Sequence, residues 1–199
     1  MKFKYLIGID EAGRGPLAGP ISLGAVAIPV KYYRAARKLF RTIKNSKHLS
    51  LAQRERWYKL MLRGKQAGRL TFACAYSSNV MIDKRGISWA TRSALRRAIH
   101  KLDYPPTCSK VRLDGSLKAP AEYRHQTTII KGDEKEMIIA MASIVAKVRR
   151  DRLIKHLAPK YPGYNLETHV GYGTEAHYRA LKKLGPSPIH RLTFLQNKP

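Results

Sequence analysis

The sequence predicts an α/β fold with a mixed central sheet flanked by helices. Short apolar runs bounded by Gly, Pro or Asp are typical of strands, and longer segments with apolar residues every three to four positions are typical of helices. They follow one another as two strands, a helix, a strand, a helix, two strands and two helices. The 199 residues, 44% of them hydrophobic, suffice for one domain with a buried core.

Five segments have the character of strands. The first is an apolar run that reaches two adjacent acids, Asp10 and Glu11, and the second is closed by Pro29. The third alternates apolar and polar residues, and the last two are short runs that each reach an aspartate. The expected strands span residues 4–10, 21–29, 69–78, 110–115 and 127–133.

Four segments have the character of helices. Ser50 is a suitable N-cap for the first, and Gly185 with Pro186 stops the last. The expected helices span residues 50–67, 87–102, 134–158 and 174–184. We expect a single domain over residues 1–199, in which residues 160–199 form a small helical C-terminal subdomain.

A large excess of positive charge indicates a polyanionic partner. The chain has 39 Lys and Arg against 13 Asp and Glu, a formal net charge of +26. Nucleic acid is the first candidate, because cations that neutralise phosphates release bound counterions. An anionic membrane is disfavoured, since the sequence has no basic amphipathic helix with a broad aromatic face. A generally basic proteome is the alternative explanation.

The cysteines and the N-terminus are typical of an intracellular protein. Cys74 and Cys108 form neither a CxxC motif nor a Cys/His cluster, so neither a disulfide framework nor a zinc site is indicated. The first apolar run stops at Asp10, too early for a signal peptide, and the sequence has no apolar span of about 18 residues for a membrane helix. We expect a cytoplasmic protein.

Three of the expected strands end in acidic residues. Asp10 and Glu11 close the first, Asp114 the fourth and Asp133 the fifth. Sites in open α/β sheets are built at strand ends, and four carboxylates that converge there cannot all ionise unopposed. A divalent cation with oxygen ligands resolves this conflict, and two such ions can catalyse phosphodiester hydrolysis. The pattern therefore favours a metal site.

Each acid also has a structural explanation, which stays open at this point. Asp133 is a suitable N-cap for the helix that follows, and Asp114 before Gly115 is typical of a turn. Because successive strand side chains face opposite ways, Asp10 and Glu11 can share a site only if the strand ends at Asp10 and the chain then turns.

The segment after the first strand, residues 13–20, contains three glycines and two prolines. It resembles a dinucleotide-binding loop only loosely, because the prolines oppose the helix that such a loop requires. Glycine backbone instead lets a sugar or phosphate approach its N–H groups closely, and Arg14 can pair with a phosphate.

Six motifs stand in order along nearly the whole chain. The most specific are IGIDEAGRGPLAGP at 7–20 and HVGYGTEAHYRAL at 169–181. The others are NSKHLS at 45–50, RLDG at 112–115, KGDEKEMIIAMASIVAKVRRD at 131–151 and HRLTF at 190–194. With these motifs the chain resembles the ribonuclease HII family, the type 2 ribonucleases H. The Gly-Arg-Gly form of the opening motif, in place of Gly-Lys-Gly, argues against the type 3 enzymes.

The resemblance implies an RNase H-like fold and a metal-dependent endoribonuclease. Such an enzyme cleaves the RNA strand of RNA–DNA hybrids and incises 5′ of single ribonucleotides in duplex DNA. Two-metal hydrolysis leaves 3′-hydroxyl and 5′-phosphate ends. The implied partners are these nucleic acids, with no membrane, and the protein is expected to be a monomer.

The resemblance also implies roles for individual residues. Catalysis and the binding of Mg²⁺ or Mn²⁺ are expected of Asp10, Glu11, Asp114 and Asp133. The backbone of Gly13, Arg14 and Gly15 is expected to contact the ribonucleotide 2′-hydroxyl, and Tyr172 to pack on the neighbouring deoxyribose. Further substrate contacts are expected at Ser46, Lys47 and Lys147.

The cations and histidines near these motifs are not expected to take part in catalysis. We expect Lys147, Arg149, Arg150 and Arg152, at the far end of the long helix, to provide some phosphate contacts and otherwise a solvated face. His169, His177 and His190 are expected to be structural or to lie near phosphate, not to bind metal.

Two positions depart from the family pattern, and two other classes of protein remain as alternatives. Asn45 stands where Asp is usual and Gly86 where Asn is expected, which affects local substrate contacts. The alternatives are a non-catalytic basic nucleic-acid-binding protein and a different RNase H-like nuclease, such as an exonuclease or a transposase.

Overall fold

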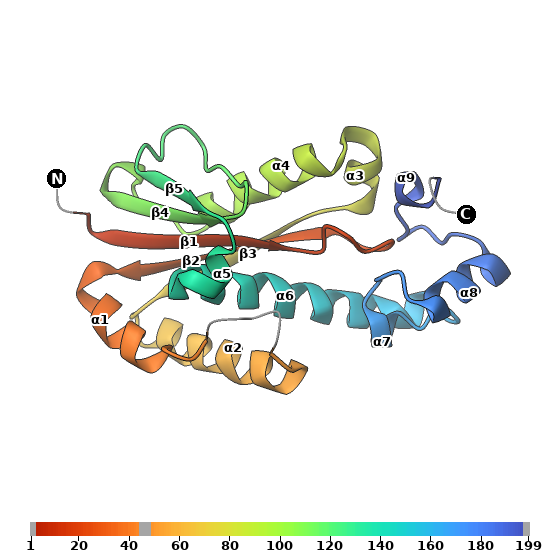
Figure 1. Cartoon of the computed structure of the whole chain (residues 1–199), viewed down its shortest axis with the longest axis horizontal. Coiled ribbons are helices and arrows are strands. Elements are labelled where there is room, and N and C mark those ends of the chain that lie inside the picture. The colour runs from red at the N-terminus through yellow and green to blue at the C-terminus, as the bar shows by residue number, and fades with distance from the viewer. Residues whose placement is uncertain (1–2, 44–48, 197–199) are drawn as a thin grey trace.

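Five strands form one mixed sheet in the order β3-β2-β1-β4-β5 (Figure 1). The structure, a computed structural model, describes residues 3–43 and 49–196. β2 is antiparallel to both β1 and β3, whereas β4 and β5 run parallel to β1. The strands are Tyr5–Ala12 (β1), Ile21–Pro29 (β2), Thr71–Ser77 (β3), Ser109–Asp114 (β4) and Gln126–Ile129 (β5). The predicted mixed sheet is confirmed.

Helices cover both faces of this sheet (Figure 1). α3 and α4 lie on one face, and α1, α2 and α6 lie on the other. The side chains of β1 alternate accordingly: Ile7 and Ile9 pack toward α4, and Leu6 packs toward α6. These helices are Val30–Leu39 (α1), Leu51–Gln66 (α2), Asn79–Arg85 (α3), Ile87–His100 (α4) and Met137–Leu157 (α6).

α6 lies very close to the sheet because two strand residues are glycines. A Cβ atom on Gly8 would be 2.2 Å from the carbonyl oxygen of Ile138, and one on Gly24 would be 2.2 Å from that of Ala142. No larger residue fits at either position without moving the helix. This packing fixes α6 over β1 and β2, beside the strand ends that carry the predicted acids.

The C-terminal elements pack beside the far end of α6 (Figure 1). They are α7 (Leu166–His169), α8 (Glu175–Leu184) and α9 (Leu192–Leu195). A small apolar cluster joins part of this region to Ala18, in the loop after β1. A β-bridge also links Ala18 to His190, so the end of the chain reaches back to the glycine-rich loop.

Three element boundaries differ from the prediction near the acids. The predicted strand 127–133 ends at Ile129 in the structure, so the prediction that Asp133 closes this strand is wrong. β1 continues to Ala12, beyond the predicted end at residue 10. The predicted helix 134–158 is interrupted, because Glu136 is extended (φ −118, ψ 116) and separates α6 from a one-turn helix, Gly132–Lys135 (α5). Glu136, not Asp133, therefore occupies the N-cap position of α6.

Four helices have no counterpart among the predicted helices: α1, α3 and, within the C-terminal region, the short α7 and α9. α1 has no fully buried residue and no side-chain cap, although Tyr32, Tyr33 and Ala36 share the face that packs against the core and its last turn is basic, as is common in helices. α3 is only seven residues long and is separated from α4 by the single residue Gly86, which has a φ of 79°.

Three positions singled out in the sequence lie outside the described residues, and one further expectation concerns membrane helices. Ser46, Lys47 and the departure at Asn45 lie in the segment that the structure does not describe. Within residues 3–43 and 49–196, no helix is both long and apolar enough to cross a membrane.

Candidate active site

A pocket of ≈ 410 Å³ lies at the carboxyl ends of the parallel strands β1 and β4. Its walls come from both strand ends, the loop after β1, α2, α6 and the segment between α7 and α8. The lining residues are Asp10, Glu11, Ala12, Gly13, Arg14, Gly15, Arg54, Asp114, Ser143, Lys147 and Tyr172. The structure thus brings together three of the four predicted acids, the glycine loop, Lys147 and Tyr172.

A larger cavity of ≈ 1000 Å³ lies between α1 and α2. Its surface is mainly apolar, and none of the predicted site residues lines it. The volume of a cavity therefore does not identify the candidate active site. The acids and the glycine-rich loop at the end of β1 identify it.

Asp10 and Glu11 both line the pocket although β1 does not turn at Asp10. The prediction that the strand ends there is wrong, because Glu11 still pairs with Leu23 of β2. On the other side of β1, pairing with β4 stops at Ile9 and Leu113. Beyond Ile9, β1 no longer pairs with β4. Side chains from both faces of β1 can therefore reach the pocket.

Asp10 is nearly buried, at 4% exposure, and lies among other acids. Its Oδ1 atom accepts a hydrogen bond of 2.7 Å from the backbone N–H of Glu11. Burial, then the carboxylates of Glu11 and Asp114, raise the pKa of Asp10 well above its usual value, while a hydrogen bond with Ser143 opposes the shift. The side chain of Glu11 lies 3.9 Å from Arg14 Nη1. A bound cation would offset the repulsion among these carboxylates.

Asp114 is bonded to the segment that carries Asp133. The backbone N–H of Gly132 donates a hydrogen bond of 2.6 Å to Asp114 Oδ1. Asp133 follows directly in α5 and has no exposed surface. It does not line the pocket, so the structure places this fourth acid in the interior, one residue from the contact with Asp114.

A buried arginine from the C-terminal motif binds both ends of the glycine-rich loop. Arg191 has no exposed surface and donates hydrogen bonds to the carbonyl oxygens of Gly13 (2.7 Å), Arg14 (2.9 Å) and Gly19 (2.9 Å). Burial, and next the nearby charge of Arg150, lower the pKa of Arg191 to about 9. Arg191 therefore still carries its charge at neutral pH.

A second buried arginine holds the end of the same loop. Arg150 of α6 donates to the carbonyl oxygens of Pro20 (3.0 Å), Ala18 (3.0 Å) and Val170 (2.9 Å). The expectation of phosphate contacts or a solvated face is therefore wrong for Arg150, which is fully buried. Its position four residues before the buried Ile154 is the periodic signal that places it on the inner face of the helix.

These two arginines determine which groups of the loop can meet a ligand. The carbonyl oxygens of Gly13 and Arg14 are already bonded to Arg191. Gly15 is exposed, and a Cβ atom there would have no heavy atom within 4 Å. The backbone at Gly15 is therefore open to a bound molecule.

Tyr172 and Lys147 lie together at another wall of the pocket. Tyr172 is 38% exposed, and the Nζ atom of Lys147 lies 4.9 Å from the centre of its ring. The same Nζ atom lies 3.3 Å from Asp151 Oδ1. These contacts hold a cation and an aromatic ring side by side next to the acids.

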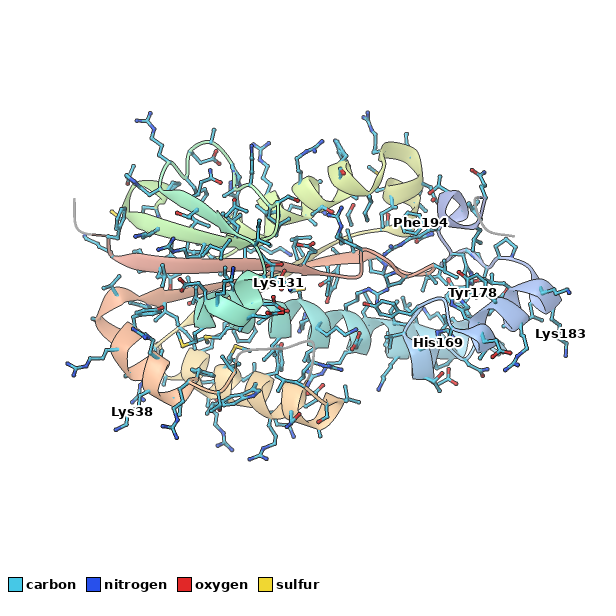
Figure 2. The ribbon with its side chains drawn as sticks, viewed as in Figure 1. Lys38, Lys131, His169, Tyr178, Lys183 and Phe194 are labelled. Carbon is cyan, nitrogen blue, oxygen red and sulfur yellow. The ribbon has the colours of Figure 1, made fainter. Side chains whose placement is uncertain are left out.

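Three buried histidines support the segment that carries Tyr172. His177 Nδ1 donates to the carbonyl oxygen of Tyr172 (2.9 Å), so its Nε2 atom accepts from His190 Nε2 (2.9 Å). His169 stacks on His177 with 4.3 Å between ring centres, and it is labelled on α7 in Figure 2. Burial lowers the pKa of His177 to about 4 and also lowers that of His190. The structural role expected of these histidines is confirmed.

Sequence reasoning missed two polar side chains of the pocket, Ser143 and Arg54. Ser143 stands one helical turn before Lys147 on α6, a spacing that places both on one face and that could have revealed it. Arg54 of α2 lies four residues after Ser50 and donates a hydrogen bond of 2.6 Å to the carbonyl oxygen of Leu49. No comparable signal marks Arg54 in the sequence.

Comparison with known proteins gives a consistent family. A family model described as Ribonuclease HII matches residues 7–197. The chain belongs to the ribonuclease HII family. Ribonuclease HII of Synechococcus elongatus is 40% identical over 196 residues, which cover 98% of this chain and 87% of that protein. Ribonuclease HII of Caldicellulosiruptor bescii is 39% identical over 195 residues, which cover 98% and 88%.

Solved structures agree with this assignment. The ribonuclease H2 of Pyrococcus horikoshii superposes with a TM-score of 0.70 at 28% identity, covering 95% of this chain and 93% of that one. The RNase HII in the PCNA complex of Archaeoglobus fulgidus gives a TM-score of 0.71 at 24% identity, covering 94% and 93%, a likeness of fold alone. The predicted RNase H-like fold is confirmed.

Membership of the ribonuclease HII family makes this chain a type 2 ribonuclease H. It is an endonucleolytic hydrolase that acts on RNA-containing nucleic acid and depends on a divalent metal. The non-catalytic binding protein left open by the sequence is therefore excluded.

The pocket offers suitable ligands for the metal that ribonuclease HII activity requires. Asp10, Glu11, Asp114 and Ser143 present only oxygen atoms, which Mg²⁺ and Mn²⁺ prefer. Within the described part of the chain, however, no three His, Cys, Asp or Glu side chains stand close enough together to hold a metal ion. The donor chemistry fits the metal, and metal binding would have to bring the carboxylates closer to one another.

Proposed function

We propose that this enzyme cleaves the RNA strand of RNA–DNA hybrids and also incises 5′ of a single ribonucleotide in duplex DNA. The products carry 3′-hydroxyl and 5′-phosphate ends. The observation that carries the proposal is the shared pocket of Asp10, Glu11 and Asp114 with the open backbone of Gly15. This arrangement supports the proposal, because acids that could bind catalytic metals would lie next to backbone that could contact a ribose.

Four carboxylates are proposed to bind two ions of Mg²⁺ or Mn²⁺, namely those of Asp10, Glu11, Asp114 and Asp133. The raised pKa of Asp10, caused by burial and then by its acidic neighbours, supports a cation at this position. Bound there, the metals would supply activation of a water molecule and stabilisation of the departing 3′-oxygen. Asp133 would act from the interior, next to the Gly132 contact with Asp114.

The loop backbone is proposed to recognise the 2′-hydroxyl, the group that distinguishes RNA from DNA at a given position. Gly13, Arg14 and Gly15 are the residues involved. Arg150 and Arg191 fix the loop through its carbonyl oxygens. A loop fixed in this way loses little conformational freedom when it binds the ribose.

Tyr172 is proposed to pack on the deoxyribose next to the ribonucleotide, and Lys147 beside it to contact phosphate. Replacing Tyr172 with Ala should reduce cutting at a single ribonucleotide by about tenfold or more while cutting of long hybrids falls less. An equal loss on both substrates would exclude a junction role. Ser46 and Lys47 remain proposed substrate contacts outside the described residues.

The organisation of the protein completes the proposal. Residues 160–199 are proposed as a helical subdomain of the single domain, supported by a small apolar cluster that packs them against α6 and the loop after β1. The enzyme is proposed to act as a monomer in the cytoplasm, where its nucleic-acid substrates would lie.

A cleavage assay on labelled duplexes tests the proposed substrate. An RNA–DNA hybrid, an RNA duplex and a DNA duplex are incubated with the enzyme in Mg²⁺, Mn²⁺ or EDTA. We expect internal cuts in the hybrid alone, with either metal, and none in EDTA. Asp114→Asn should abolish cutting, whereas the exposed Asp103→Asn serves as the matched control. Removal of nucleotides only from the ends, or equal cutting of the RNA duplex, would contradict the proposal.

A further inference from the structure

A strongly basic pocket lies on the same face of the sheet as α6. It has a volume of ≈ 540 Å³ and is enclosed by α1, β4 and the link between α5 and α6. Five cations line it: Arg37, Arg41, Lys110, Arg112 and Lys135. Among the described residues that line it, Glu136 is the one acid, so the pocket carries a strong excess of positive charge.

Three elements direct these cations into one space. Arg37 follows Tyr33 by one turn of α1, so both lie on one helix face, and Arg41 follows at the end of this segment. On β4, Lys110 and Arg112 alternate with buried residues and share a face of the strand. Lys135 and Glu136 complete the wall between α5 and α6.

The electrostatic surroundings of Tyr33 support this arrangement. Burial, followed by the charge of Glu136, raises the pKa of Tyr33, while Arg37 and Arg112 act in the opposite direction. These charged side chains therefore surround one phenol, which stays protonated and can donate a hydrogen bond.

The cations of this pocket form no ion pair with an acid of the described residues. The ion pairs formed within residues 3–43 and 49–196 all involve other side chains. Five cations beside a single acid repel one another, and a cleft lined mainly by one sign of charge concentrates ions of the other sign. Guanidinium groups in particular match the geometry of phosphate oxygens.

The basic pocket is connected to the active site through β4. Asp114 follows Arg112 by two residues on the same face of the strand, a separation of about 7 Å along the strand. Successive phosphates of one strand advance by about 3.4 Å along a duplex. A nucleic-acid backbone whose reacting phosphate lies at Asp114 therefore has further phosphates within reach of Arg112.

We propose that this pocket binds the phosphate backbone of the nucleic-acid substrate, roughly two to four nucleotides from the bond that is cut. The assignment of the backbone to the substrate rests on the proposed function. The pocket gives a specific purpose to part of the net charge of +26, which is otherwise widely spread. In Figure 2, for example, Lys38, Lys131 and Lys183 lie on three separate parts of the molecule.

Binding measured in EDTA tests this proposal without any cleavage. The affinity for a fluorescent 30-base-pair hybrid is determined over a series of salt concentrations for the wild type and for Arg37→Gln/Arg41→Gln. Each lost phosphate contact should reduce the slope of log Kd against log salt by about 0.9, so we expect a decrease of about 1 to 2. The control is Arg92→Gln/Arg96→Gln, two exposed cations on α4 at the opposite face. It removes the same charge and should change the slope by much less.

A second variant should change the affinity in the opposite direction. Glu136→Gln removes the one acid that lines the pocket and should tighten binding severalfold. Equal slope changes in both arginine variants, or unchanged binding in Glu136→Gln, would overturn the proposal.

Inorganic phosphate distinguishes a nucleic-acid backbone from a free anion. If phosphate binds the wild type but not Arg37→Gln/Arg41→Gln, while the duplex slopes are equal, the pocket is a free-anion site and the backbone assignment is wrong. Failure of the proposed function would appear separately, as absent cleavage with the slopes as expected.

Discussion

Arg191 donates a hydrogen bond of 2.7 Å to the carbonyl oxygen of Gly13, although the two residues are 178 positions apart in the chain. The contact is buried and belongs to a set of three that Arg191 makes with the loop after β1. The C-terminal motif therefore shapes the active site without lining it. Its contribution should be visible in both stability and activity.

Arg191→Lys should lower the free energy of unfolding by about 1–3 kcal/mol and reduce cleavage. A lysine cannot make three hydrogen bonds in the planar arrangement of a guanidinium, so at least one buried carbonyl loses its partner. Urea denaturation measures the change. The exposed Arg179→Lys is the matched control, and an unchanged denaturation midpoint for Arg191→Lys would show that the buried contacts contribute nothing.

Gly13 and Gly15 of the loop should respond differently to alanine. Gly13 has a φ of 91°, and its added Cβ atom would lie 2.2 Å from Arg150 Nε, so Gly13→Ala should cost about 1–3 kcal/mol of stability. Gly15→Ala meets no neighbour and should change stability by less than about 0.5 kcal/mol. It should nevertheless reduce cleavage by about tenfold or more, because its methyl group would project where the substrate is proposed to bind. Full activity of Gly15→Ala would remove the loop from substrate recognition.

The buried histidines should make the fold sensitive to acid. The pKa of His177 is about 4 in the folded protein, below the ordinary histidine value of 6.5, so the unfolded chain binds a proton first as the pH falls. Stability is therefore retained above about pH 6.5 and lost as the pH falls toward 4. The expected loss from this group is about 2 kcal/mol between pH 7 and pH 5.

Urea denaturation of His177→Gln at these two pH values isolates this contribution. The variant should lose less stability between them than the wild type, whereas the exposed His100→Gln should behave like the wild type. Identical pH dependence in His177→Gln and the wild type would mean that other groups cause the acid sensitivity.

Metal binding should appear as thermal stabilisation that requires Asp10. Saturating Mg²⁺, at about 100 times its Kd, should add about 2.7 kcal/mol and raise the Tm by several degrees. Asp10→Asn removes one charge from a crowded group of carboxylates, so its Tm in EDTA should equal or exceed that of the wild type. Mg²⁺ should then raise the Tm of this variant much less. Equal stabilisation of both proteins by Mg²⁺ would place the metal elsewhere.

Much of the fold and of the site could be predicted because the signals are local. The strands are short apolar runs, and Asp10, Glu11 and Asp114 stand at their ends, where the sheet brings them to one pocket. The glycine loop and Tyr172 lie in specific motifs that resemble those of one family. None of these features requires knowledge of a distant contact.

The rest could not be predicted because it depends on burial and on pairing across the chain. The helical period places Arg150 on the inner face of α6, but the carbonyl oxygens that accept its hydrogen bonds come from Ala18, Pro20 and Val170, which only the tertiary fold brings together. The bonds of Arg191 join opposite ends of the sequence. α1 was missed because it covers the sheet without burying any residue completely.

The most direct test of the proposed activity uses a labelled DNA duplex that contains one ribonucleotide. The wild type and Asp10→Asn are incubated with it in Mg²⁺, Mn²⁺ or EDTA, and the cut is mapped to the nucleotide. We predict one metal-dependent cut immediately 5′ of the ribonucleotide, with a 3′-hydroxyl end, and no cut by Asp10→Asn. A cut that persists in EDTA or in the variant, or none beside the ribonucleotide, would contradict this prediction.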